Sequence, residues 1–451
     1  MLHRLLQLYR TGPDRPAFSQ DRGQIRRVYE RMRWRVFLTT TIGYGLFYTT
    51  RLSLSVVKEP LVNSGVFDPA ELGTIGSALL FTYAFGRLTN GFLADRANIK
   101  RFMATGLFIS ACINLVLGFT TAFWVFALLW GLNGWFQSMG SAPSVVSLTQ
   151  WFSLSERGSR YGIWSTSHCI GEAITFAGTA AVVSVLGWQA GFWAPGLLCL
   201  LGAAVMLRTH ADRPQTYGLP PVADYKNDHP TRPPPDQPVS TGRRQLEVLT
   251  NPWIWVLGFS AALMYMARYA INNWAIWFLQ VEKNLELMDA SLVASTAPIA
   301  GLVGSAASGI ISDKLFNTRR NWPTLIYGLM QVGALIMLYL VPADSFWLAA
   351  VALSLFGFAT GGLLVFLGGL IAVDIVSKKA TGAAMGVIGL FSYLGAALQD
   401  LISGLLIDAT EVVDAAGASS YSFDTAFAFW LGAAVLSMLL AACAWRVRAR
   451  D

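Results

Sequence analysis

Three arginines lie inside strongly apolar stretches of this sequence, at Arg51, Arg87 and Arg268. An arginine at bilayer depth costs about 2.5–3.5 kcal/mol on insertion scales, so it is retained where it faces a polar cavity or reaches an interface. Each guanidinium presents a planar fork of N–H donors that matches the oxygens of a tetrahedral oxyanion. Two converging forks therefore predict binding of phosphate or a phosphate ester, since a carboxylate would leave one arginine poorly paired.

The elements that hold these arginines are predicted to be transmembrane helices. The chain has 451 residues, 54% of them apolar and only 13% charged, whereas a soluble protein carries roughly 25% charged residues. A helix crosses a bilayer with about 20 apolar residues. The runs that meet this requirement are 34–57, 72–94, 102–119, 121–148, 161–187, 190–207, 252–280, 289–312, 323–342, 346–376, 382–407 and 424–445. We predict an all-α polytopic membrane protein with twelve transmembrane helices.

The basic residues orient these helices. All but five of the 33 Lys and Arg residues fall in the two ends of the chain, the central segment and alternate loops. The exceptions are the three arginines above and Lys58 and Lys283, which we place in outer loops. Basic loops stay in the cytoplasm, so both termini and the central segment are expected there. Residues 1–33 lack an apolar core and are predicted to be a cytoplasmic basic arm, not a cleaved signal peptide.

A proline-rich segment, 208–251, divides the chain into two six-helix halves, 34–207 and 252–446, with a cytoplasmic tail at 447–451. We expect this segment to be an extended, partly disordered linker in which nothing can bury a face. The halves repeat each other, because Tyr48-Thr-Thr-Arg51 corresponds to Tyr265-Met-Ala-Arg268. This repeat places the two arginines opposite each other across a central cavity, where transporters of such architecture bind substrate.

A second repeated motif, Gly-x-x-x-Asp followed by Arg or Lys, ends the second and eighth predicted helices. Its carboxylate could bind a basic group or a helix N-terminus in one conformation only, and so affect the balance between open and closed states. The predicted conformational residues are Gly91, Asp95, Arg96, Gly309, Asp313 and Lys314.

These duplicated loops resemble those of the major facilitator superfamily. Within it, the stretch Trp151-Phe-Ser-Leu-Ser-Glu156-Arg157, which continues to His168, is similar to the signature of the organophosphate:inorganic phosphate antiporter family. Asp212-Arg-Pro-Gln-Thr-Tyr-Gly218 resembles the linker of its hexose-6-phosphate transporter and sensor branch. Arg268-Tyr-Ala-Ile-Asn-Asn-Trp274 and Gly389-Leu-Phe-Ser-Tyr393 continue the likeness over nearly the whole chain.

The resemblance implies a phosphate clamp at Arg51 and Arg268, with Arg87 as an auxiliary basic residue. It also implies that His168 contacts the phosphate, although a histidine in an apolar helix is, on its own, more typical of a structural residue. The other predicted substrate-binding residues are Tyr48, Tyr265, Tyr393, Asn272, Gln399, Asp400 and Glu172.

The chain departs from the family pattern at several positions. The basic residue that often follows the first arginine is Leu52, the helix-eight Glu falls at Pro298, and helix ten lacks the Pro-Gln of hexose-phosphate relatives. Two acids, Glu172 and Asp400, stand where relatives tend to have small residues. Each could bind a sugar hydroxyl, pair with an arginine, exchange a proton, or lock two helices together. The residues predicted to bind the phosphate are present, and the identity of the organic part of the substrate stays undetermined by the sequence.

The resemblance and the paired arginines predict a transporter that exchanges an organophosphate for inorganic phosphate by alternating access. The alternative is a membrane sensor of external hexose phosphate that signals to a partner kinase. The sequence lacks H-E-x-x-H and G-x-x-x-x-G-K-S/T motifs, which disfavours an enzyme or an ATP-driven pump. We expect a monomer in a bacterial inner membrane, with no cofactor, no metal and no nucleic-acid partner.

Overall fold

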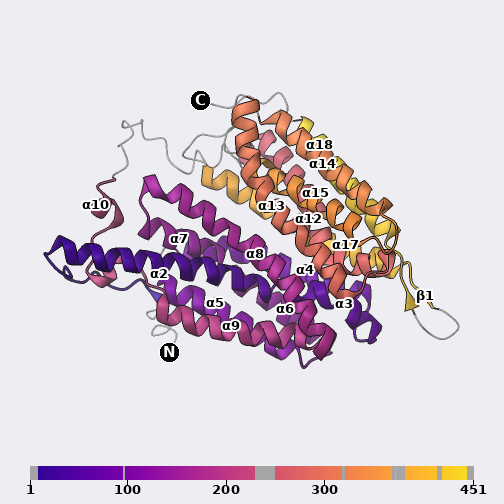
Figure 1. Cartoon of the computed structure of the whole chain (residues 1–451), viewed down its shortest axis with the longest axis horizontal. Coiled ribbons are helices and arrows are strands. Elements are labelled where there is room, and N and C mark those ends of the chain that lie inside the picture. Colours follow the sequence, from indigo (N-terminus) through magenta and orange to yellow (C-terminus); the bar gives the residue numbers. More distant parts are fainter. Residues whose placement is uncertain are drawn as a thin grey trace.

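The computed structural model describes residues 9–94, 97–228, 249–316, 320–367, 371, 381–413 and 419–443. Figure 1 shows two helical halves, one coloured indigo to magenta and the other orange to yellow, lying side by side. The first half contains α2 (Arg22–Thr49), α3 (Ser53–Asn63), α4 (Pro69–Ala94), α5 (Ile99–Leu117), α6 (Phe123–Gln137), α7 (Ser141–Trp151), α8 (Leu154–Leu186) and α9 (Ala190–Thr209). The second contains α12 (Pro252–Lys283), α13 (Leu287–Leu315), α14 (Asn321–Leu340), α15 (Phe346–Val365), α17 (Thr381–Asp408) and α18 (Asp424–Cys443).

The predicted twelve-helix architecture is confirmed. The pair α2 and α3 forms one interrupted span, and so does the pair α6 and α7. With these, the described helices form six spans in each half. Within the described residues, 9 helices are long and apolar enough to cross a membrane as single unbroken segments. The other spans are the two that contain a break and α4, which carries Arg87.

The break between α2 and α3, at Thr50–Leu52, is stabilised by side chains. The hydroxyls of Thr49 and Thr50 donate to the carbonyls of Leu46 and Phe47, at 2.8 and 3.3 Å, which competes with continuation of the helix. The carbonyl oxygen of Thr50 accepts hydrogen bonds from Asn114 Nδ2 on α5 (3.2 Å) and Asn133 Nδ2 on α6 (2.8 Å). These amides satisfy a buried carbonyl that the interrupted helix leaves free.

The two halves meet through α4 with α17, α8 with α13, and α3 with α12. Glycines allow close approach, because a Cβ on Gly73 would lie 2.9 Å from Cα of Gly404. We call the end that contains Asn63–Asp68 and the antiparallel strands β1 (Val412–Val413) and β2 (Ser419–Ser420) the hairpin end. The opposite end, which contains residues 9–21 and α10 (Val222–Lys226), is the arm end; in Figure 1 the hairpin end lies on the right and the arm end on the left.

The first part of the predicted linker is folded onto the first half. His210, Asp212 and Leu219 are buried, and a short 3-10 helix, η1 (Pro214–Tyr217), precedes α10. The Asp212 carboxylate accepts from Asn98 Nδ2 at 3.1 Å, while Trp151 Nε1 donates to the Asp212 carbonyl at 2.8 Å. The expectation that nothing in 208–251 can bury a face is therefore wrong for 209–228. Residues 229–248 lie outside the described residues.

Charged side chains fasten α10 to the first half. Arg33 pairs with Glu30 at 2.9 Å and with Glu156, and Lys226 of α10 lies 3.2 Å from Glu156. Tyr225 of α10 donates to Glu30 at 3.0 Å. Burial would raise the pKa of Glu30, but Arg33, the Tyr225 hydroxyl and Lys226 together hold it below its ordinary value. Helix α2 begins at Arg22, so the end of the predicted basic arm is already helical.

Candidate anion-binding site

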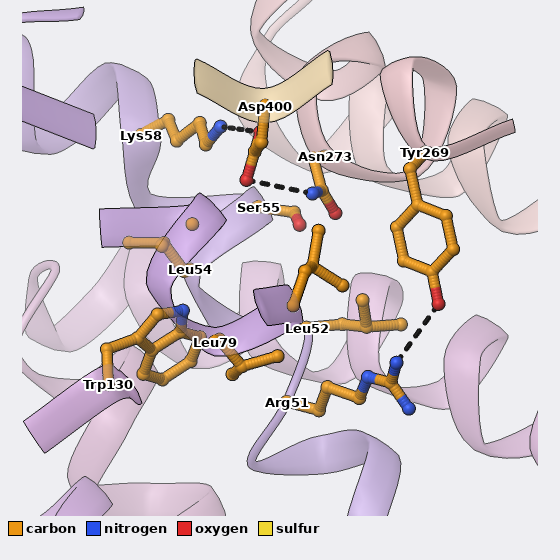
Figure 2. Close-up of a pocket in the computed structure, with 12 residues that line it drawn as sticks. Arg51, Leu52, Leu54, Ser55, Lys58, Leu79, Trp130, Tyr269, Asn273 and Asp400 are labelled. Carbon is orange, nitrogen blue, oxygen red and sulfur yellow. Dashed lines mark hydrogen bonds and ion pairs between the residues drawn. The ribbon is translucent and has the colours of Figure 1, made fainter. Parts of the chain in front are cut away.

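The three arginines predicted from the sequence lie around the same aromatic side chains. Arg51 comes from the break between α2 and α3, Arg87 from α4 and Arg268 from α12. Arg51 Nη2 donates to the hydroxyl of Tyr269 at 3.0 Å, across the boundary between the halves (Figure 2). The Arg51 Cζ atom also lies 4.1 Å from the ring centre of Tyr83, a cation–π contact.

Two tyrosine rings link the three guanidinium groups. The Tyr269 ring centre lies 5.5 Å from Cζ of Arg268, and the Tyr269 hydroxyl accepts from Arg51. The Tyr393 ring centre lies 5.8 Å from Cζ of Arg51 and 5.5 Å from Cζ of Arg87. Because both tyrosines belong to the second half, the cluster brings residues from both halves to one place.

Tyrosines form the walls of this cluster, and only some of them are among the residues predicted from the sequence. Tyr48, Tyr265 and Tyr393 were predicted, and the ring centres of Tyr265 and Tyr393 lie 5.5 Å apart. The members that sequence reasoning missed are Tyr44, Tyr83 and Tyr269. A signal was available, because each lies four residues from a predicted residue, which puts it on the same helical face: Tyr44 precedes Tyr48, Tyr83 precedes Arg87, and Tyr269 follows Tyr265.

The positive charge of the cluster is not neutralised by ion pairs. In the part of the chain that the structure describes, no carboxylate forms an ion pair with Arg51, Arg87 or Arg268. Arg51 is buried, Arg268 is half-buried and Arg87 is exposed. A buried cation without an ionic partner is costly, which applies to Arg51, and the whole cluster suits an anion that supplies several acceptor oxygens.

Beside this cluster, His168 and Glu172 of α8 face Arg268 and Asn272 of α12 across a recess. The His168 ring contacts the Ser165 carbonyl through Nδ1, and Nε2 lies 3.3 Å from Sγ of Cys169. Its ring centre is 5.9 Å from that of Tyr48. The structure thus places His168, Glu172 and Asn272 at the edge of the arginine cluster.

Asp400 takes part in an ion pair between the halves. Its Oδ1 atom lies 3.4 Å from Nζ of Lys58, and both side chains are 1% exposed. Asn273 Nδ2 and Trp274 Nε1 also donate to the Asp400 carboxylate, at 3.1 and 2.5 Å. Figure 2 shows this pair and the Arg51–Tyr269 pair along one pocket. Of the alternatives for Asp400, the geometry favours the interhelical lock.

The assignment of Lys58 to an outer loop is corrected by this pair. Lys58 lies in α3, buried, with Nζ 3.1 Å from the ring centre of Trp274. Lys283 is also buried, and it donates to the carbonyls of Tyr339 and Val341 at 2.7 and 2.8 Å. Lys58 is therefore a further basic residue inside the fold, beyond the three arginines.

Gln399 does not join the site. It is fully buried, and its Nε2 atom donates to Ser403 Oγ at 2.8 Å, next to Trp430 of α18. Adjacent helical residues point about 100° apart, so Gln399 lies toward Ser403 while Asp400 lies toward Lys58. A role for Gln399 in substrate binding stays a prediction.

The predicted conformational motifs remain predictions. Asp95 and Arg96 lie outside the described residues. Gly309, Asp313 and Lys314 belong to the last turns of α13, where the side chains are not described. Gly91 lies near the end of α4, and a Cβ there would meet only Ala142, at 3.9 Å.

The profile of the Major Facilitator Superfamily matches residues 37–399. The chain belongs to this superfamily. It is 33% identical over 402 residues to the "Probable hexose phosphate transport protein" of Chlamydia pneumoniae, covering 86% of this chain and 88% of the relative. It is 34% identical over 394 residues to the "Membrane sensor protein UhpC" of Salmonella typhimurium, with the same coverage of 86% and 88%.

More distant similarity extends over almost the whole chain. The "Glycerol-3-phosphate transporter" of Bacillus subtilis is 29% identical over 441 residues, covering 95% of this chain and 96% of the relative. These relatives place the chain in the organophosphate:inorganic phosphate antiporter family. Among solved structures, an inward-facing, unoccupied bacterial homolog of the lysosomal transporter Spinster has a TM-score of 0.72 at 16% identity, covering 92% of this chain and 95% of that one. At this identity the likeness shows the fold alone.

Proposed function

We propose that this protein exchanges an organophosphate, such as a sugar phosphate or glycerol-3-phosphate, for inorganic phosphate by alternating access. The observation that carries the proposal is the cluster of Arg51, Arg87 and Arg268, which come from both halves and have no carboxylate partner among the described residues. Three relatives whose names include hexose phosphate or glycerol-3-phosphate support the organic substrate class.

Obligatory exchange follows from the charge of the empty site. Moving between the two open states requires both ends to close around the cluster, which removes water from the guanidinium groups. Without an anion, this desolvation is opposed by uncompensated positive charge. Bound phosphate or organophosphate supplies the missing acceptors, so only the occupied carrier crosses readily.

The positions of the contacts support an inward-facing state. The cross-half bonds Lys58–Asp400 and Gln280–Glu59 (2.9 Å) lie toward the hairpin end, whereas Arg87, on the arm side of the cluster, is exposed. The distribution of basic residues places the arm end in the cytoplasm. We therefore propose that both termini lie in the cytoplasm and that the protein lies in the inner membrane of a bacterial cell. The monomeric state expected from the sequence stays a prediction.

A sensor is the second candidate function. The likeness to a membrane sensor protein favours it, and so does the folded surface that residues 9–21 and 209–228 make at the arm end. A partner kinase could dock on that surface. Both candidates bind the same phosphate ester, and they differ in whether the chain alone moves substrate across a membrane.

The deciding experiment is uptake of labelled phosphate by vesicles that contain the purified protein. We expect rapid uptake only when the vesicles are preloaded with phosphate or organophosphate, and we expect its loss in Arg51→Lys and Arg268→Lys. Lysine keeps the charge but removes the planar fork. The matched control is Arg27→Lys, exposed on α2 at the arm end, which should retain uptake. Equal uptake by loaded and empty vesicles would refute exchange; phosphate binding without uptake would support the sensor.

A further inference from the structure

The recess beside the arginine cluster has walls from both halves. His168 and Glu172 belong to α8 of the first half, and Arg268, Asn272, Ser305 and Thr360 belong to the second. Since Arg268 also belongs to the arginine cluster, a ligand whose phosphate occupies the cluster can extend its other end into this recess.

The Glu172 carboxylate is the distinctive group in the recess. The side chain is 2% exposed, and it forms no ion pair within the described ranges. Arg268 lines the same recess and is the positively charged residue beside it. An ionised carboxylate accepts hydrogen bonds and donates none. The Asn272 amide supplies one donor to Glu172, and the remaining acceptor positions call for donors from a ligand.

The wall from the second half adds the hydroxyls of Ser305 and Thr360 and the amide of Asn272. Ser305 already donates its proton to the carbonyls of Gly301 (2.9 Å) and Gly361 (2.9 Å), which leaves its oxygen free only to accept. The Thr360 hydroxyl accepts from Gln331 Nε2 at 3.0 Å and can donate elsewhere. The Asn272 amide can both donate and accept. Such a surface matches hydroxyl groups, which also do both.

This wall is held in place by glycine contacts between α13 and α15. A Cβ on Gly357 would lie 1.9 Å from the Ala297 carbonyl oxygen, and one on Gly361 would lie 2.0 Å from the Gly301 carbonyl oxygen. Backbones this close leave no room for side chains and fix the positions of Ser305 and Thr360. The recess is thus preorganised on the side of the second half.

We propose that Glu172, with Asn272, forms a subsite for the uncharged, hydroxyl-bearing part of the substrate and rejects organophosphates whose other end carries a carboxylate. This subsite rests on the proposed function, because it takes the phosphate to be held by the arginines. A substrate carboxylate would face the buried Glu172 carboxylate at short range, where like charges repel. An ammonium group is disfavoured as well, because Arg268 lines the same recess.

Glycerol-3-phosphate and 3-phosphoglycerate test the subsite, because they differ only in a hydroxymethyl group against a carboxylate. We expect purified wild-type protein to bind glycerol-3-phosphate more tightly by on the order of tenfold or more. In Glu172→Gln, which keeps the size of the side chain, this preference should fall to near parity. The control Glu71→Gln, at the first turn of α4, should keep the wild-type preference.

A second variant covers the case in which Glu172→Gln does not fold. Asn272→Ala should weaken glycerol-3-phosphate binding more than it weakens binding of inorganic phosphate, which does not reach the recess. Equal affinity of the wild type for the two esters, or an unchanged preference in Glu172→Gln, would overturn the subsite while phosphate binding persists. Absence of phosphate binding in the wild type would instead overturn the proposed function.

Discussion

The buried ion pair between Lys58 and Asp400 should help to hold the hairpin end closed. The pair joins α3 of the first half to α17 of the second, and it must separate when that end opens. Lys58→Met removes the charge and retains the apolar stem that lies on Trp274. The variant leaves Asp400 buried without its cation as long as the hairpin end stays closed. We therefore expect the substitution to shift the population toward a state in which this end is open.

The magnitude follows from the burial of the pair. Removing one partner of a buried ion pair costs about 3–5 kcal/mol. Both side chains are 1% exposed, so solvent screening reduces the cost little, but Asn273 and Trp274 still donate to Asp400. We therefore take the lower figure, about 3 kcal/mol, or roughly a hundredfold in the equilibrium constant. A hairpin-open state populated at about 1% would become about half of the molecules.

Spin labels can report this shift. Asn63, at the end of α3, and Val412, in β1, are exposed and lie in different halves at the hairpin end. In a background without the four native cysteines, the distance between labels at these positions should be mainly short in the wild type. Lys58→Met should add a large population at longer distance.

The double variant Lys58→Met/Asp400→Asn is the control for this prediction. It removes both charges and keeps a carbonyl oxygen that can accept from Trp274 or Asn273, so most of the shift should disappear. An unchanged distance distribution in Lys58→Met would show that the ion pair does not hold the hairpin end closed. A double variant that shifts as far as the single one would show that the effect does not come from an uncompensated charge.

The break between α2 and α3, the arginine cluster and the buried His210 can each be tested by one substitution. Asn133→Ala leaves the Thr50 carbonyl with Asn114 as its amide partner, so the protein should lose about 1–3 kcal/mol of stability, visible as a lower thermal midpoint; an unchanged midpoint would contradict the role given to this amide. Tyr269→Phe removes the acceptor that orients Arg51, so phosphate affinity should fall by about tenfold in a titration, and undiminished affinity would argue against that orientation. Burial lowers the pKa of His210 from 6.5 to about 4, so the unfolded chain binds the proton first and stability should decline as pH falls through that window. His210→Gln should flatten the decline in melting curves recorded across this range; an equally steep decline in the variant would count against the assignment.

Much of the site could be predicted because charge inside a membrane segment is conspicuous. Arg51, Arg87 and Arg268 stand out from their apolar neighbours, and the internal repeat relates two of them. The tyrosines around them do not stand out, because tyrosine also anchors helices at membrane interfaces. Tyr83 and Tyr269 could be found only by their four-residue spacing from Arg87 and Tyr265, once those residues are accepted as part of a site.

The remaining differences come from contacts between residues that are distant in sequence. Lys58 lies just beyond the end of a predicted span, so the span limits predict that it belongs to an outer loop. The break after Thr50 and the ion pair with Asp400 keep it buried instead. That break depends on amides from α5 and α6, contacts that no local pattern contains. The buried part of the proline-rich segment has the same origin, because Asp212 is held by Asn98 and Trp151, both distant in sequence.

Recognition of the substrate's phosphate group by the arginine cluster can be measured by calorimetric titration of the purified protein. Glucose-6-phosphate and inorganic phosphate should bind to the wild type and glucose should not, while Arg51→Lys and Arg268→Lys should each abolish the heat of phosphate binding. Binding of glucose as tight as that of glucose-6-phosphate, or unaltered phosphate binding in both variants, would contradict the account.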